Sequence, residues 1–470
     1  MITRKEKNDG LKVEVKARLC LCGFKESEKP RSDSPTADRL STKLFYTISA
    51  NESWEIESLD ITSAFLQGSE LERNIFVIPP KEAGMNGMLW KMRKAAYGLN
   101  DASRKFWQRI MELLTGLGCK PVVGDKTLLY FHNNGKLEGL LCLHVGDILG
   151  GGTPHFKTKI LDEVEKTFAC SKRERNSFRY TGVDVEREKD GNIVASQEVY
   201  VESLEEIPIK DSSDNKRSLT KPEFKDFRGA IGKLSWISEQ TRPDISYECL
   251  EMSCHSRDAK VGDLKRMNKT IKKMKSKKVK IRYTKVGDFD QIKVLAVTDG
   301  AYNKLEEKTI SVAGRIIFLS NDDESVVTPI MWKAKSIPTV CKSAKAAETR
   351  AADKCVDDAV YIARTINEIY KGERGESQIP VDVVTDSQAL IDGLNLTQRI
   401  EEKLLWPIIK YLKQCMDARM VRNVRWCDTN VCLADIFTKS SAPLIDTVLE
   451  IVESNKLINL NRAKKRNGGE

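Results

Sequence analysis

The stretch that most constrains this chain is Leu140–Gly152, which reads LLCLHVGDILGGG. An apolar run, a polar corner from His144 to Asp147, a second apolar pair and three glycines predict a β-hairpin with a buried body and a tight turn. Farther upstream, Asp60 follows the hydrophobic start of LDITSAFLQG. Acids at the ends of two separate strands can meet, and such a pair is the minimal plan of a magnesium site for phosphoryl transfer. The alternative is that each Asp is only a turn residue, which is the commoner role at a strand end.

Composition sets the broad class of the chain. Its 470 residues are 40% hydrophobic and 31% charged, an ordinary globular profile, and the length suggests about two to four domains. No apolar run reaches about eighteen residues and the N-terminus is polar, so we expect no membrane span, no signal peptide and no membrane partner. The net charge of +10 favours a polyanionic partner.

The twelve cysteines are scattered without a regular framework. In the absence of a secretory signal, they are expected to be reduced thiols. Cys20 and Cys22 are spaced too tightly for the usual zinc knuckle, so no zinc site is predicted there.

The first half of the chain mixes helical and strand patterns. Lys16 and Arg18 alternate with apolar neighbours, which indicates either a solvated edge strand or a basic strand that touches phosphates. Downstream of them we expect a helix over Ser32–Ala50, a strand over Ile75–Pro80, a helix from Ala102 to Gly116 or Gly118, strands around the turn Asn133–Gly135, a helix over His155–Phe168, and two strands in Phe178–Gln197 joined at Asp190–Gly191.

A change of character follows. Phe227–Ser253 is expected to be helical up to a break at Thr241–Pro243. The next segment, Leu264–Tyr283, is lysine-rich and has no acidic residue. It predicts either a solvated helix face or a contact with a phosphate backbone. The residues nominated for that contact are Lys265, Arg266, Lys269, Lys272 and Lys273.

A second α/β unit is predicted from about residue 290. Four acids stand at similar places in it: Asp299 and Asp386 at strand ends, Glu348 in the first turn of a helix over Lys345–Tyr370, and Asp435 at the opening of the last helix. For each acid alone, a capping or solvated role is the simpler interpretation. Together they can converge at one edge of a mixed sheet, where their mutual repulsion requires hard cations. Two Mg²⁺ ions about 4 Å apart would then activate water for phosphodiester hydrolysis.

Several motifs in this order resemble a known family. They are KARLCLCGF from Lys16, LDITSAFLQG from Leu59, AYGLNDASRKF from Ala96, TRPDI from Thr241 and LADIFTK from Leu433. The chain resembles the reverse transcriptase and RNase H portion of a copia-type LTR-retrotransposon Pol polyprotein, from about Lys16 to Lys439. The resemblance implies a right-hand polymerase with fingers, palm and thumb, followed by an RNase H-like domain with a mixed β-sheet.

The resemblance also implies roles for individual residues. Lys16, Arg18, Tyr97 and Gly98 would contact the incoming nucleotide, and Gly182 the primer end. Asp60 and Asp147 would be the palm carboxylates that bind metal. In the RNase H domain Asp299, Glu348, Asp386 and Asp435 would be the catalytic metal ligands. The implied cofactor is Mg²⁺, with Mn²⁺ as an alternative, and the implied partners are an RNA–DNA hybrid, a template RNA with its primer, and a dNTP.

Two departures from the family pattern bear on activity. The signature YVDD is replaced by His144-Val145-Gly146-Asp147, so the first Asp of the pair is glycine. Asp147 is expected to point to the other face of its strand. A loop glutamine is replaced by Asp101, which is expected to add negative charge where the nucleotide enters.

These observations lead to a set of expectations. Polymerization should be lost or impaired, while RNase H cleavage of hybrids is more readily retained. The competing hypothesis is a non-catalytic nucleic-acid-binding protein, either a relic or a co-opted copy. The start inside the fingers, with no protease or integrase segment, leads us to expect a truncated copy that acts in cytoplasmic particles or in the nucleus. The sequence fixes no oligomeric state. The predicted divisions are 1–200 (fingers and palm), 201–288 (thumb and connection), 289–445 (RNase H-like) and 446–470 (C-terminal helix and disordered tail).

Overall fold

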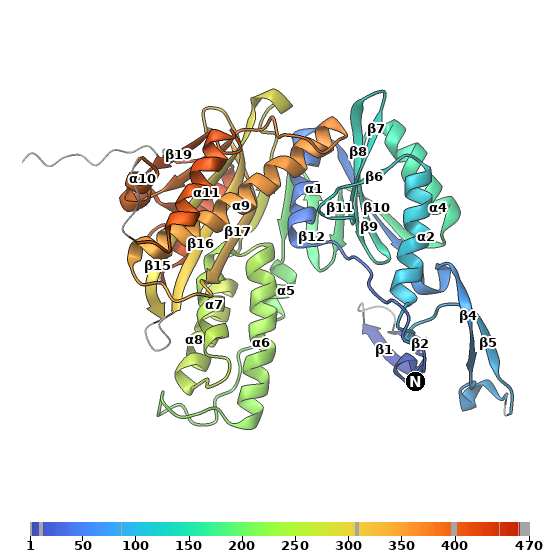
Figure 1. The fold of residues 1–470 in the computed structure, drawn as a ribbon. Coiled ribbons are helices and arrows are strands. Elements are labelled where there is room, and N and C mark those ends of the chain that lie inside the picture. Colours follow the sequence, from blue (N-terminus) through green and yellow to red (C-terminus); the bar gives the residue numbers. More distant parts are fainter. Residues whose placement is uncertain are drawn as a thin grey trace, which may run out of the picture. The chain divides into compact units, whose positions relative to one another are not determined.

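The computed structural model describes residues 2–8, 13–85, 87–305, 310–395, 402–440, 442–458 and 460. The chain divides into two compact units (Figure 1). Unit 1 comprises residues 1–41 and 56–175, and unit 2 comprises residues 42–55 and 176–470. The predicted divisions at residues 200, 288 and 445 are finer than this split and stay predictions.

A six-stranded sheet forms the centre of unit 1, with the strand order β10-β3-β9-β8-β7-β6. The predicted hairpin is confirmed: β8 (Lys136–His144) and β9 (Asp147–Gly152) pair antiparallel, with His144 opposite Asp147. The remaining strands are β3 (Glu55–Ile61), β6 (Lys120–Pro121), β7 (Leu128–Asn133) and β10 (Cys170–Arg175).

Helices cover this sheet because their apolar faces match its buried side chains. In α2 (Ala102–Gly116), Phe106, Ile110 and Leu114 are buried, as the helical spacing predicts. The predicted helix after β9 runs as α3 (Pro154–Phe156), a π-helical segment (Lys157–Leu161) and α4 (Asp162–Thr167). Burying one Leu or Phe side chain fully in this core stabilises the folded state by about 1.5 to 3 kcal/mol relative to leaving it exposed.

Two small hairpins complete unit 1. One joins β1 (Ile2–Asn8) to β2 (Val13–Leu19), and the other joins β4 (Glu70–Val77) to β5 (Trp90–Lys94). The predicted strand over Ile75–Pro80 is therefore wrong in its bounds: Ile75–Val77 ends the longer strand β4, and residues 78–80 lie beyond it.

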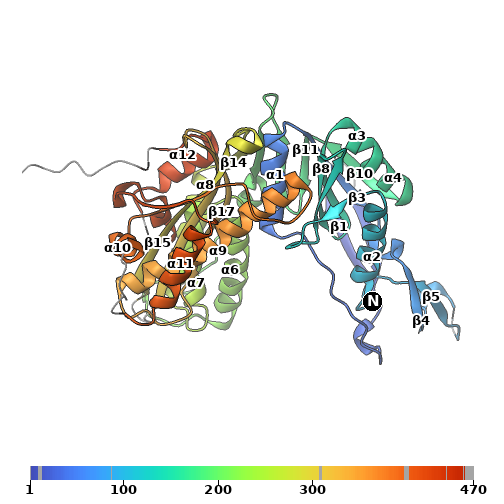
Figure 2. The same cartoon turned by 45° about the horizontal axis from the view of Figure 1, so that its top comes forward.

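Unit 2 begins with a four-stranded antiparallel sheet in the order β11-β12-β13-β14. Its strands are β11 (Ser177–Tyr180), β12 (Val183–Arg187), β13 (Ile193–Ser196) and β14 (Lys280–Tyr283). The prediction of two strands in this region was incomplete: a second turn at Thr181 and Gly182, with φ of 46° and 82°, splits the first strand into a hairpin. Figure 2 shows α12 (Ile445–Ser454) near β14, against which it packs.

Three helices follow in unit 2: α6 (Lys221–Gln240), α7 (Ser246–Cys254) and α8 (Val261–Ser276). The break predicted at Thr241–Pro243 is confirmed. Arg242 there is buried; it forms a bidentate ion pair with Asp244 and donates to the carbonyl oxygens of Met274 and Lys277, at the end of α8. Arg242 of the TRPDI motif thus supplies hydrogen bonds to carbonyl groups at the C-terminal end of α8, which have no partner within the helix.

A five-stranded mixed sheet forms the second half of unit 2, in the order β17-β16-β15-β18-β19. The strands are β15 (Ile292–Leu305), β16 (Ile310–Asn321), β17 (Val327–Ser336), β18 (Val381–Thr385) and β19 (Asn423–Trp426). The first three pair antiparallel, and β18 and β19 add in parallel. The long helix α9 (Ala344–Lys371) packs on this sheet, and α10 (Gln388–Asn395) and α11 (Trp406–Asp417) follow (Figure 1).

Several predicted boundaries were wrong. The first helix, α1, covers Arg39–Asn51 rather than starting at Ser32, because the Asp38 carboxylate accepts the Ser41 N–H and caps it there. Strand β15 continues past Asp299. Asp435 lies in a short 3₁₀ helix, Leu433–Phe437, and not at the start of the last helix. The basic tail predicted to be disordered lies, after residue 460, outside the described residues.

Candidate functional sites

The predicted palm acids come together in unit 1. Asp60 lies near the end of β3, and Asp147 begins β9, its neighbour in the sheet. The Ile61 N–H donates to the Gly146 carbonyl at 2.9 Å, which ties the two strand ends together. Both acids line one cavity of about 750 Å³, together with Tyr97. Burial, followed by the nearby Asp60 charge, raises the pKa of Asp147.

One expectation about this corner was wrong. Asp147 was expected to face away, yet it borders the same cavity as Asp60. The reason is local: Val145 adopts φ of 54°, a strained value for a β-branched residue, so strict strand alternation does not hold through the turn. Ser171 holds the other acid, since its hydroxyl donates to Asp60 Oδ2 at 2.5 Å.

Gly146 stands in this cavity without a ligand atom. A Cβ atom placed on Gly146 would lie 3.1 Å from Ala64 Cβ and 3.2 Å from the Ile61 carbonyl oxygen. A side chain there needs a shift of a few tenths of an ångström at the end of β3. The cavity therefore contains two carboxylates, Asp60 and Asp147, whereas the family motif has a third at the position of Gly146.

The loop with Tyr97 and Gly98 is fixed by backbone contacts. Leu21 N–H donates to the Tyr97 carbonyl at 2.7 Å, and Gly23 N–H donates to the Gly98 carbonyl at 3.1 Å. Gly98 has φ of 93°, and a Cβ there would lie 2.1 Å from the Leu21 oxygen, so only glycine fits. Tyr97 stacks edge-on against Phe65, with 5.1 Å between ring centroids. The side chains of Lys16 and Arg18, on β2, lie outside the described part of the structure.

Asp101 does not have the position expected of it. It is 2% exposed and forms a bidentate ion pair with Arg73, at 2.5 and 3.0 Å. Arg73 also donates to Glu26 at 2.5 Å. Burial acts to raise the pKa of Asp101, but the hydrogen bonds and charge of Arg73 outweigh it and the pKa is lowered. The added charge is neutralised inside the protein, and Asp101 is not among the residues that line the cavity of Asp60 and Asp147.

Gly182 lies in the turn between β11 and β12 in unit 2. Its φ is 82°, and a Cβ atom there would lie 2.8 Å from the Trp236 ring of α6. The turn is therefore packed tightly on a helix. Its role toward a primer stays a prediction.

The four predicted RNase H acids come together in unit 2. A Cβ on Gly300 would lie 2.5 Å from the Glu348 nitrogen, which shows how closely α9 approaches β15 beside Asp299. Gly314, which pairs with Asp299 in the sheet, leaves room in the same way for the 3₁₀ helix that carries Asp435. Asp386 follows the end of β18. Contrary to expectation, Glu348 is beyond the first turn of α9, whose N-cap is Ser343.

The electrostatics of this cluster reflect its crowding. Burial, then the Asp299 charge, raises the pKa of Asp386. Burial, with Asp386 and Asp299 adding to it, raises the pKa of Glu348 despite a hydrogen bond from Ser387. For Asp435, burial is again the main cause, and the pKa rises to about 6. Carboxyl groups that disfavour ionization in this way are stabilised by a bound cation.

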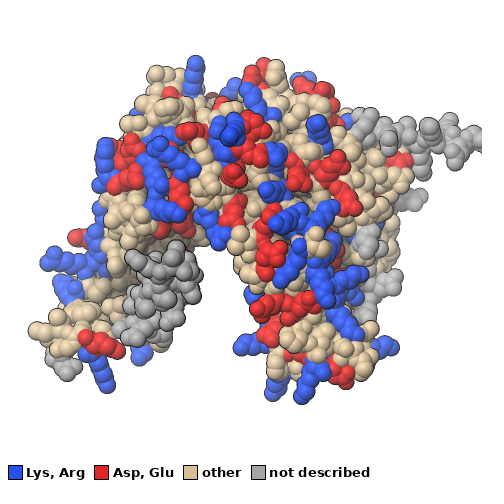
Figure 3. Space-filling view, turned by 180° about the vertical axis from the view of Figure 1, so that it is seen from behind, with Lys and Arg blue, Asp and Glu red and all other residues tan. Residues whose placement is uncertain are grey.

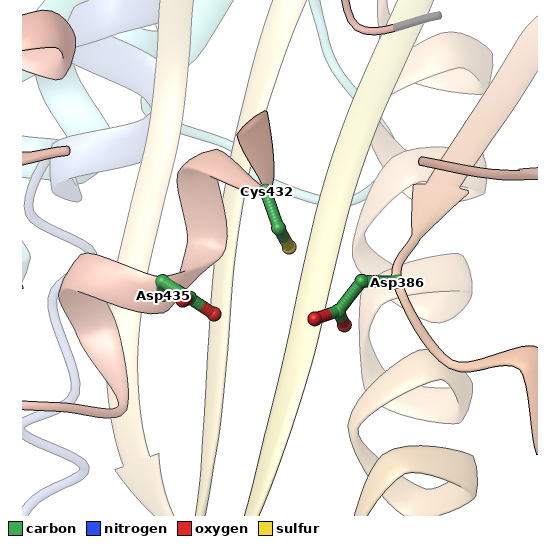
Figure 4. Close-up of side chains that lie close together, drawn as sticks. All are labelled: Asp386, Cys432 and Asp435. Carbon is green, nitrogen blue, oxygen red and sulfur yellow. The ribbon is translucent and has the colours of Figure 1, made fainter. Parts of the chain in front are cut away.

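Besides Thr429, whose hydroxyl interacts with Asp386, four further side chains of the described residues at this site were not found from the sequence. The Thr438 hydroxyl donates to Asp299, the Ser387 hydroxyl donates to Glu348, and Lys439 Nζ donates to Asp435 Oδ2 at 2.7 Å. The fourth is Cys432, one ligand atom of which lies within 4.8 Å of one from Asp386 and one from Asp435 (Figure 4). Thr438 and Lys439 end the LADIFTK motif, which was the only sequence signal for any of them.

Most of the nominated basic residues on α8 have partners within unit 2. Lys265 donates to the Ser212 carbonyl at 2.6 Å, Arg266 pairs with Glu251, Lys272 with Glu206, and Lys273 with Glu248. Of the five, Lys269 is exposed, and within the described part of the structure it forms no ion pair or hydrogen bond. In the face shown in Figure 3, Lys and Arg are interspersed with Asp and Glu. Acids from other elements therefore pair with three of the five nominated residues, and the contact with a phosphate backbone stays a prediction.

The fold defines the class of protein: a right-hand polymerase fold followed by an RNase H-like domain. A foamy viral protease–reverse transcriptase, solved in complex with double-stranded DNA, has a similar fold, with a TM-score of 0.53 at 11% identity over 91% of this chain and 65% of that one. Residues 1–216 match the family model of reverse transcriptase (RNA-dependent DNA polymerase).

Curated relatives narrow this class. A Retrovirus-related Pol polyprotein from transposon RE1 of Arabidopsis thaliana is 25% identical over 78% of this chain and 26% of its own length. That from transposon TNT 1-94 of Nicotiana tabacum is 24% identical over 93% of this chain and 34% of its own length. Residues 1–216 thus belong to the reverse transcriptase family, and the chain is related to the reverse transcriptase and RNase H portion of copia-type retrotransposon Pol polyproteins. It spans about a quarter to a third of these relatives.

No described helix is long and apolar enough to cross a membrane.

Proposed function

We propose that unit 2 hydrolyses the RNA strand of RNA–DNA hybrids with divalent metal ions, and that the polymerase site of unit 1 is impaired. The observation that carries this proposal is the asymmetry between the two sites. Four acids meet in unit 2, whereas two acids and a glycine meet in unit 1.

The residues in unit 2 fit a hard cation. Asp435 is 6% exposed, and its Oδ1 is buried without a hydrogen-bond partner. An orphaned carboxylate oxygen of this kind is costly unless a ligand satisfies it. Asp299, Glu348, Asp386 and Asp435 would hold Mg²⁺ or Mn²⁺, which when bound supplies activated water and stabilises the leaving oxygen.

The chain's own side chains would orient this site. Thr438 fixes Asp299 and Ser387 fixes Glu348, so that both carboxylates are held before substrate arrives. Lys439 offsets part of the negative charge through Asp435 Oδ2, and it leaves Oδ1 available.

The site in unit 1 supports a different conclusion. Asp60 and Asp147 border an accessible cavity with Tyr97, as an incoming dNTP and a primed template would require. Without a carboxylate at position 146, one metal ligand of the family pattern is missing. We therefore expect little or no primer extension.

The test of this proposal is cleavage of a labelled RNA strand in an RNA–DNA hybrid, with Mg²⁺ and then with EDTA. We expect Mg²⁺-dependent cutting that Asp386→Asn abolishes. Asp392→Asn, on the helix that follows, is the matched control, because Asp392 is exposed and accepts a hydrogen bond from Gln388 of its own helix. Retained cleavage in Asp386→Asn would overturn the assignment.

A second candidate function is a non-catalytic nucleic-acid-binding protein. The exposed Lys269 and the net charge of +10 favour it. A folded protein that binds hybrids with a steep salt dependence and cuts none would support this alternative over the first.

A further inference from the structure

A thiol lies among the carboxylates of the unit 2 site. Cys432 is 0% exposed and precedes the 3₁₀ helix that carries Asp435. One ligand atom each from Asp386, Cys432 and Asp435 lie within 4.8 Å of one another. Figure 4 shows the two carboxylates facing each other with the sulfur beside them.

We propose that Asp386, Cys432 and Asp435 form a mixed sulfur–oxygen site for a thiophilic divalent cation of the zinc class. Such an ion would compete with Mg²⁺ for the two carboxylates and inhibit hybrid cleavage, a consequence that rests on the proposed RNase H function.

The geometry suits such an ion with small movements. In tetrahedral zinc coordination, bonds of about 2.3 Å to sulfur and about 2.0 Å to oxygen place the ligand atoms roughly 3.5 Å apart. Atoms already within 4.8 Å of one another reach that spacing by side-chain rotation.

A second observation points independently to a ligand. The Asp435 side chain is 6% exposed and its Oδ1 has no hydrogen-bond partner, while Oδ2 is held by Lys439. The free oxygen is therefore the one available to a cation. The ion would gain two carboxylates and a thiolate in a largely buried setting.

The donor set determines which cation is favoured. Carboxylates alone suit Mg²⁺, whereas a thiolate is a soft ligand that selects Zn²⁺ or Cd²⁺. On binding, the Cys432 S–H bond breaks, a sulfur–metal bond forms and the proton passes to solvent. No electron transfer is involved.

The experiment uses the full chain with Cys20→Ser, Cys22→Ser and Cys427→Ser, because Cys20 and Cys22 are close in sequence and the Cys427 thiol hydrogen-bonds with Cys432. Cd²⁺ is titrated into metal-free protein, and the ultraviolet thiolate-to-cadmium charge-transfer band is followed. We expect a band that Cys432→Ala abolishes and that Asp386→Asn shifts to roughly 100-fold higher Cd²⁺ concentration. Cys355→Ser is the matched control, because that thiol is also 0% exposed and lies on α9 of the same unit.

An unchanged band in Cys432→Ala overturns the proposal, provided that circular dichroism shows the variant folded; Cys432→Ser is the second variant if the alanine protein does not fold. The readout needs no nuclease activity. A Cys432-dependent band without any Mg²⁺-dependent cleavage would thus contradict the proposed function and still support the metal site. If cleavage is present, Zn²⁺ inhibition measured against each variant's own zinc-free rate should weaken by about 100-fold in Cys432→Ala.

Discussion

The two acidic sites of this protein are built in similar ways and differ in completeness. In unit 1, Asp60 and Asp147 come from neighbouring strand ends, and the third position of the pattern is Gly146. In unit 2 the acids come from strand β15, from the residue after strand β18, from the long helix α9 and from a 3₁₀ helix, and hydroxyl groups of Ser387 and Thr438 contact two of them. The site in unit 1 thus brings two acids together and has no side chain at position 146, where the family motif has an acid. The two sites show that a shared arrangement of strands and acids does not by itself determine which reaction a site can catalyse.

The largest expected effect comes from restoring the missing acid to the site in unit 1, which tests the difference between the two sites directly. Gly146→Asp should raise primer extension at least about 100-fold, because a restored metal ligand is worth several kcal/mol in the transition state. Extension of a labelled primer on an RNA template measures it, with the uncharged Gly146→Asn as control.

Steric crowding can mask this gain. Because Ala64 Cβ lies 3.1 Å from a Cβ at position 146, the double variant Gly146→Asp with Ala64→Gly should do at least as well as the single one. Robust extension by the unaltered chain would show instead that Asp60 and Asp147 suffice.

The next effect concerns stability in unit 1. Asp101→Gln should lower the free energy of unfolding by about 3 kcal/mol, because it leaves Arg73 without its buried bidentate partner. It should therefore not help polymerization. Chemical denaturation with hydrogen exchange of α2 measures the loss.

The control for Asp101 is an exposed pair of the same chemistry. Arg31 and Asp33 have side chains that are 73% and 57% exposed, so Arg31→Gln, which leaves the pair of Asp33 with Arg104 in place, should change stability little. Equal losses in both variants would show that burial of the Asp101 pair has no energetic weight.

A smaller effect is expected when the hydrogen bond from Ser387 to Glu348 in the unit 2 site is removed. Under the proposed function, Ser387→Ala should lower hybrid cleavage about 10-fold, since the Ser387 hydroxyl donates to the Glu348 carboxylate and would hold it in position. The Mg²⁺ concentration for half-maximal rate should rise as well, and Ser387→Thr should restore part of the loss. A lower rate with unchanged Mg²⁺ dependence would argue against a positioning role.

The smallest effect concerns the basic helix. Lys269 and Lys275 are exposed on α8, and replacing both by alanine should reduce the log–log salt slope of hybrid binding by up to about two units. Fluorescence anisotropy at several salt concentrations measures the slope. The matched control replaces two exposed lysines of unit 1, Lys126 and Lys136. An identical change of the salt slope in both double variants would show that α8 has no special part in hybrid binding.

The sequence by itself determined much of this protein. The hairpin at His144–Asp147, helix α2, the break at Thr241–Pro243 and the mixed sheet follow from apolar periodicity and turn residues, which act locally. The four acids of unit 2 were predicted to meet because their strand and helix contexts and the family motifs agree.

Only the tertiary structure decided the rest, because it depends on contacts between residues far apart in the chain. Asp101 is neutralised by Arg73, Asp147 turns into the cavity of Asp60, and acids from other elements engage most of the nominated α8 cations. Gly300 and Gly314 allow the close approaches that bring Glu348 and Asp435 to Asp299. No local pattern marks such pairs, since each residue is ordinary in its own segment and gains its role from the partner that folding places beside it.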